Sequence, residues 1–159
     1  MPNSTLWWGN HLQSPNGFLI HIVPHNTQDL TSLVESTRPL NFATFCIDGE
    51  KINSKESLLG SIARSMRFPS YFGKNWDALE DSINDLSWWK VKGFLLIFEQ
   101  ADSFINSSID EFFVFIEIIS NTIKSWYVRG LPFYGVITIS DDFAEKKSLI
   151  WGNNDLCYH

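Results

Sequence analysis

The sequence contains only two cysteines, Cys46 and Cys157, which lie far apart and match no metal-ligand spacing. We therefore expect two free thiols in a reducing compartment. The N-terminus lacks a basic stretch followed by an apolar run, so the sequence predicts no signal peptide. The longest apolar block, residues 112–119, is interrupted by Glu117 and is too short to cross a bilayer. These absences favour a cytoplasmic protein with no membrane segment.

Motifs for catalysis and cofactor binding are missing too. None of the four histidines stands at a recognisable spacing from a nucleophile, and His21 lies in an apolar segment, where a core role is usual. No glycine-rich loop of the kind that holds phosphate is present, and we expect turns at Gly130 and Gly135. The sequence thus predicts neither an enzyme nor a cofactor.

Basic residues are scarce in the second half of the chain. Residues 1–74 contain five acidic and six basic residues, whereas residues 75–159 contain the other thirteen acidic residues and six basic ones. The overall net charge is −6. An acidic half argues against direct binding of nucleic acid and favours a basic partner.

The apolar pattern alternates between strands and helices along one domain of 159 residues. We predict strands at 18–23 (closed by Pro24), 42–47, 94–98 and 136–139. We predict helices at 27–36, at 54–66 with Asn53 or Ser54 as the cap, from 76, and from 109 towards Trp126, where 108–111 fits a capping box. This alternation indicates an α/β fold with a small, mainly parallel sheet packed with helices.

The segment from Tyr71 to Asp81 predicts a glycine turn followed by an acidic helix. On a wheel of about 100° per residue, one arc is apolar, formed by Trp76, Leu79, Ile83 and Leu86. The opposite side carries carboxylates, with Glu80 at the edge and, in a row, Asp77, Asp81 and Asp85. Like charges four apart weaken a helix by about 0.2–0.5 kcal/mol per pair. The helix dipole favours Asp77 in the first turn but not Asp81, so we expect Asp81 to face a partner.

Two other interpretations of this acidic face stay open. One is a solvated surface without a partner, because runs of charge usually serve solubility. The other is a Mg²⁺ or Ca²⁺ site, since hard cations take carboxylate oxygens. Carboxylates on three successive turns span about 11–12 Å of helix axis, so at most two of Asp77, Asp81 and Asp85 would share one ion. We predict no metal ligand here.

The same segment resembles the signature of the barstar family of intracellular ribonuclease inhibitors. The likeness rests on the string Tyr-Phe-Gly-Lys-Asn-x-Asp-Ala-Leu-x-Asp at 71–81, and extends upstream through 47–52, 54–66 and 68–69. It returns weakly at 94–98 and 136–140. The resemblance therefore implies a barstar-like core at 42–140, with an N-terminal extension at 1–41 and a C-terminal tail at 141–159. We expect the extension to add a strand and a helix to the sheet, or else to cover part of the binding face.

The resemblance also implies roles for individual residues. In this family the helix and loop matching 71–81 block the active site of the ribonuclease, and a carboxylate takes the place of the substrate phosphate. Asp81 matches that carboxylate and Asp77 the supporting one, while Tyr71 and Gly73 match the loop on the enzyme surface. Asn75 matches a position suited to capping or to contact.

The chain also departs from the family pattern. Glu80 and Ser82 stand where the family has a tryptophan and a cysteine, and the large aromatic moves to Trp76. Trp88 and Trp89, in a longer loop after the helix, either replace a contact tryptophan or cover the edge of the core. These changes suggest a related inhibitor with a different basic enzyme as its target.

We therefore predict an intracellular immunity protein of the toxin–antitoxin kind that occludes the active site of a basic ribonuclease toxin, with no nucleic acid or membrane as partner. The predicted partner-binding residues are Tyr71, Phe72, Gly73, Asn75, Trp76, Asp77, Glu80, Asp81, Asp85 and Trp88. The alternatives are an acidic module for another basic protein, such as a DNase, or a metal-binding carboxylate enzyme. The sequence does not indicate an oligomeric state.

Overall fold

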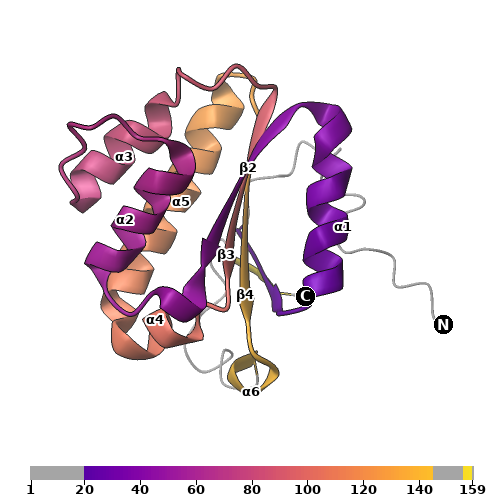
Figure 1. Cartoon of the computed structure of the whole chain (residues 1–159), viewed down its shortest axis with the longest axis vertical. Helices are drawn as coiled ribbons and strands as arrows, with labels where there is room; N and C mark the ends of the chain where they lie inside the picture. Colours follow the sequence, from indigo (N-terminus) through magenta and orange to yellow (C-terminus); the bar gives the residue numbers. More distant parts are fainter. Residues whose placement is uncertain (1–19, 145–155, 159) are drawn as a thin grey trace.

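The computed structural model describes residues 20–144 and 156–158, which form a parallel sheet with helices on both faces (Figure 1). The strand order is β2-β3-β4-β1-β5, and each neighbouring pair is parallel. The strands are β1 (Ile20–Pro24), β2 (Phe42–Asp48), β3 (Gly93–Glu99), β4 (Phe133–Ile139) and β5 (Leu156–Tyr158). The predicted α/β class with a mainly parallel sheet is thus confirmed.

The helices divide unequally between the two faces of the sheet. Figure 1 shows α1 alone on one face and the larger group on the other. The helices are α1 (Thr27–Thr37), α2 (Lys55–Met66), α3 (Trp76–Asp85), α4 (Asp102–Ser107), α5 (Ile109–Val128) and α6 (Asp141–Ala144), with 3₁₀ turns η1 (Arg38–Leu40) and η2 (Gly49–Lys51). No helix in the described ranges combines the length and apolarity that a membrane span requires.

The described part of the N-terminal extension adds a strand and a helix to the sheet, which confirms the first of the two expectations for this segment. β1 lies between β4 and β5, and α1 packs Leu30 and Leu33 onto the face opposite the acidic helix α3. The alternative, that this extension covers α3, is wrong for residues 20–41. Residues 18 and 19 of the predicted first strand lie outside the described residues.

Other predicted elements differ in detail from the structure. The prediction of a capping box at 108–111 is wrong, because the Ser108 side chain makes no cap hydrogen bond and the Glu111 carboxylate accepts a hydrogen bond from Trp76. Gly135 is a buried residue of β4 and not part of a turn. A Cβ at Gly135 would lie 3.3 Å from Cγ2 of Ile119, so its absence lets α5 approach the strand closely. Gly130, at φ 81°, follows α5 as predicted.

The main core lies between the sheet and the group α2, α3, α4 and α5. Phenylalanine rings fill much of it, including Phe45, Phe94 and Phe98, all of which are buried. Gly49 of η2 lies directly against the end of β3, because a Cβ there would be 2.0 Å from the carbonyl oxygen of Glu99. The backbone of η2 can therefore approach the end of β3 only through a glycine. This packed layer is the base on which α3 rests.

Candidate functional site

The acidic helix α3 begins at a side-chain cap and ends where the chain turns left-handed. Asn75 is the N-cap, and its Oδ1 accepts a hydrogen bond from the amide of Ala78 at 2.8 Å. Leu79 and Ile83 are fully buried on the inner side. Leu86 follows as the C-cap at φ 44°. The apolar arc predicted from the sequence is therefore the packed face of the helix, and Asn75 serves capping.

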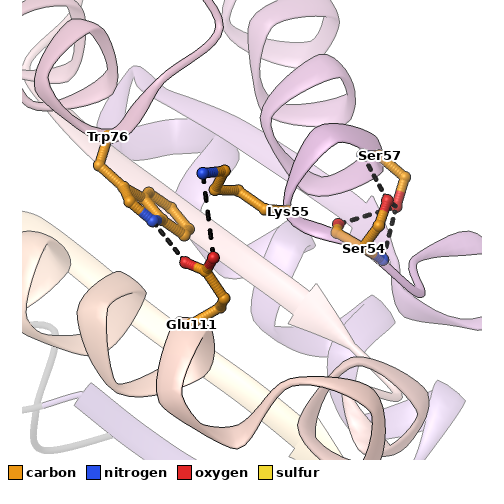
Figure 2. A network of polar contacts seen from close by, with 5 residues as sticks. All are labelled: Ser54, Lys55, Ser57, Trp76 and Glu111. Atoms are coloured by element: carbon orange, nitrogen blue, oxygen red, sulfur yellow. Dashed lines mark hydrogen bonds and ion pairs between the residues drawn. The ribbon is translucent and has the colours of Figure 1, made fainter.

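The first turn of α3 is fixed to two other helices through Glu111 of α5 (Figure 2). Nε1 of Trp76 donates a hydrogen bond to Oε2 of Glu111 at 2.6 Å. Nζ of Lys55, in the first turn of α2, lies 3.9 Å from Oε1 of the same carboxylate. One carboxylate thus joins the beginnings of α2, α3 and α5. The indole of Trp76 is half-buried and directed at α5.

Replacing Glu111 with alanine should lower the free energy of unfolding by about 1–2 kcal/mol, because the indole N–H of Trp76 loses a charged acceptor. Urea denaturation of both proteins measures the change. Glu117→Ala is the matched control, since Glu117 is an exposed carboxylate on the same helix. Equal destabilisation by the two substitutions would show that the Glu111 contact does not fix α3.

The last turns of α2 and α3 are capped by tryptophan side chains. The final carbonyls of a helix have no amide partner within it. Nε1 of Trp126 donates to the carbonyl oxygen of Ile83 in α3 at 2.9 Å. Trp88 and Trp89 both donate to the carbonyl oxygen of Met66, the last residue of α2, at 2.9 and 2.8 Å. Of the two roles left open for Trp88 and Trp89, this contact supports the structural one.

Asp85, at the end of α3, lies close enough to Arg129 for their charges to interact. Partial burial lowers the pKa of the Arg129 guanidinium, and the Asp85 carboxylate acts in the opposite direction. The guanidinium also stacks on Trp126, with Cζ 3.5 Å from the ring centroid. A carboxylate at a helix C-terminus is unfavourable in the helix dipole, so Arg129 offsets the cost of Asp85.

Three other carboxylates of α3 are not paired in this way. Asp77, Glu80 and Asp81 are exposed, and none forms a side-chain hydrogen bond or salt bridge with another described residue. We call these three residues the acidic face. Within residues 20–144 and 156–158, no group of three or more His, Cys, Asp or Glu side chains is arranged to hold a metal ion. The acidic face is thus a set of solvated anions on a helix that is fixed at both ends.

The loop before α3 continues this exposed surface. Tyr71 is 82% exposed, the most exposed aromatic side chain among the described residues. Phe72 packs edge-on against Phe68, with ring centroids 5.0 Å apart, and so anchors the loop. A Cβ on Gly73 would lie 3.4 Å from Nδ2 of Asn75, an ordinary contact. The free protein therefore does not require a glycine at 73.

The predicted site residues divide into a mostly exposed set and a set with partners inside the protein. The loop residues and the acidic face are contiguous along the chain and exposed, apart from the half-buried Phe72. Asn75, Trp76, Asp85 and Trp88 each interact within the protein, and their binding to a partner stays a prediction. The roles of Glu111 and Trp126 could not be predicted from the sequence, because their contacts with α3 span 35 and 43 residues.

A family model described as Barstar (barnase inhibitor) matches residues 42–138, more than half of the chain. No curated protein matches the chain. Two structures of the Aeropyrum pernix ORC2 protein resemble the chain. That of the ADPNP-ADP complexes has a TM-score of 0.62 at 12% identity, and that of the ADP form 0.61 at 11%. Each likeness covers 92% of this chain and 42% of the other.

At these identities the ORC2 likeness shows the fold alone. The chain spans less than half the length of those structures. The connection from β1 to α1 is only His25-Asn26, which leaves no room for a glycine-rich phosphate loop at that position. The likeness therefore adds no ligand to the site.

Proposed function

Because the chain belongs to the family of barstar, the barnase inhibitor, we propose that it is an immunity protein that inhibits a basic ribonuclease by covering the enzyme's active site with α3. The observation that carries this proposal is the acidic face. Asp77, Glu80 and Asp81 are exposed and unpaired among the described residues, on a helix held by Glu111 and Trp126. A helix that is already held in place loses little freedom on binding.

The chemistry of the target follows from these carboxylates. A ribonuclease active site gathers cationic side chains around the phosphate of its substrate. A carboxylate that accepts two hydrogen bonds from an arginine imitates two phosphate oxygens. Asp81 is suited to that position because it lies one turn inside the helix, between Asp77 and Asp85. Such an inhibitor acts in the cytoplasm of the cell that makes the toxin.

The test is a titration of the purified protein against a panel of small basic bacterial ribonucleases, including the product of any adjacent nuclease gene. We expect stoichiometric loss of RNA cleavage by one of them, weaker at high salt because complementary charge speeds the encounter. Inhibition of a basic DNase as well would indicate a general acidic inhibitor. RNA cleavage by the chain alone, abolished by a chelator, would indicate the metal-dependent alternative. Inhibition of no ribonuclease would contradict the proposal.

A further inference from the structure

A basic groove lies beside the loop of the proposed binding surface. Its volume is about 370 Å³, and it is lined by α2 on one side and by residues 67–74 on the other. Arg64, Arg67 and Lys74 surround it, and Phe68 and Phe72 contribute its apolar wall. No acidic residue is among its lining residues. We call this feature the basic groove.

The three cations of the basic groove are not neutralised within the described residues. Arg64, Arg67 and Lys74 are exposed, and neither of the salt bridges found there involves them. Arg67 lies over the ring of Trp89, with Cζ 5.1 Å from the centroid, which positions the guanidinium without cancelling its charge. A protein with a net charge of −6 thus gathers three positive charges at one place.

Two of these cations lie at left-handed backbone positions. Arg67 and Lys74 have φ values of 56° and 49°, the left-handed region in which glycine or asparagine is the usual choice. Arg67 is the C-cap of α2, the position where glycine is most common. Other described residues also adopt this conformation, so it does not by itself indicate a site. The dipole of α2 favours a cation at Arg67, at the end of that helix, whereas Lys74 lies outside any helix and has no such reason.

The basic groove and the acidic face are close in the chain, because Lys74 of the groove is three residues before Asp77 of the acidic face. The segment 69–74 lines the groove and carries Tyr71, and Asn75 then begins α3. A partner that covers Tyr71 and the beginning of the acidic face therefore also reaches the edge of the groove at Lys74. An enzyme face that is basic throughout would meet Arg64, Arg67 and Lys74 with like charges, which costs several kcal/mol across an interface.

We infer that the basic groove receives an acidic segment of the same ribonuclease, next to that enzyme's cationic active site. This inference rests on the proposed function and adds the determinant of specificity. The acidic face attracts basic ribonucleases in general, whereas the groove rejects those without carboxylates at the matching position. Attraction to the right partner combined with repulsion of the wrong ones is how specific interfaces discriminate.

The test uses a substitution that separates local contact from overall charge. Arg64→Glu and Arg38→Glu change the net charge equally, but Arg38 lies in η1, after the helix on the opposite face of the sheet. The probe is the ribonuclease of the panel that the unaltered chain inhibits. For a basic enzyme, a more acidic inhibitor should bind as well or better. We instead expect Arg64→Glu to raise the inhibition constant roughly tenfold or more, and Arg38→Glu not to raise it.

Lys74→Glu provides a second variant, because Lys74 lies outside any helix or strand, and circular dichroism confirms that each variant is folded. If Arg64→Glu and Lys74→Glu inhibit as strongly as Arg38→Glu, the groove contacts no acidic segment and the inference is wrong, while the proposed function stands. If the unaltered chain inhibits no ribonuclease, both fail. Binding of a labelled RNA oligonucleotide that Arg64→Glu abolishes would also overturn the inference, in favour of a nucleic-acid site.

Discussion

Replacing Asp81 with alanine should remove most of the inhibition of the ribonuclease while leaving the protein folded. A carboxylate that is desolvated against arginine and lysine side chains leaves those charges buried and unpaired when it is truncated. The expected cost is about 2–5 kcal/mol of binding free energy. Since about 1.4 kcal/mol corresponds to a tenfold change, the inhibition constant should rise by about thirtyfold to several thousandfold.

The stability of the free protein should respond in the opposite direction. Asp81 is exposed and lies four residues from both Asp77 and Asp85. Its removal takes away two like-charge pairs, each worth about 0.2–0.5 kcal/mol, and alanine favours the helix. Urea denaturation should therefore show an unchanged or slightly higher free energy of unfolding. Loss of inhibition without loss of stability assigns the effect to the interface.

Two further variants make the Asp81 experiment decisive. Asp81→Asn keeps the shape and removes the charge, so it should lose nearly as much inhibition as the alanine variant if charge is what binds. Glu35→Ala removes one negative charge from α1, on the opposite face of the sheet, and should change the inhibition little. Unchanged inhibition by Asp81→Ala would rule out the carboxylate as a phosphate mimic and move the contact elsewhere on the surface.

Local signals in the sequence predicted the elements that carry the site. The Asn75 cap, the buried residues Leu79 and Ile83, and the exposed aspartates of α3 all follow from spacing and capping rules. The strand β2 alternates between buried and more exposed residues, and β3 is a continuous apolar run. The helices α2 and α3 lie between these strands in the chain. In such segments the apolar pattern repeats over neighbouring residues, so periodicity along the sequence is enough to predict the element.

Elements that depend on distant contacts could not be predicted in this way. The strand β5 has only three residues and pairs with β1, more than 130 positions away, and α4 has only six. The fit of 108–111 to a capping box misled because Glu111 has a better donor in Trp76, 35 residues earlier. Gly135 suggested a turn, whereas the reason for it is the close packing of Ile119.

Replacing Trp126 with alanine should destabilise the protein by about 3–5 kcal/mol, the range for a large aromatic removed from a core. Trp126 is 5% exposed, and its ring centroid lies 4.8 Å from that of Phe94. It also supplies the hydrogen bond that satisfies the carbonyl of Ile83 at the end of α3. The substitution thus opens a cavity and leaves a buried acceptor without its donor.

Trp126→Phe separates the two contributions. It keeps a six-membered aromatic ring in the core and removes the pyrrole part with its N–H donor, so we expect a smaller loss, dominated by the unsatisfied buried carbonyl, of about 1–3 kcal/mol. Val128→Ala, at a residue that is 84% exposed near the end of the same helix, should change stability little. Urea denaturation of the three variants gives the comparison. A phenylalanine variant as stable as the unaltered chain would show that packing alone holds the end of α3, and that the acidic face does not depend on this hydrogen bond.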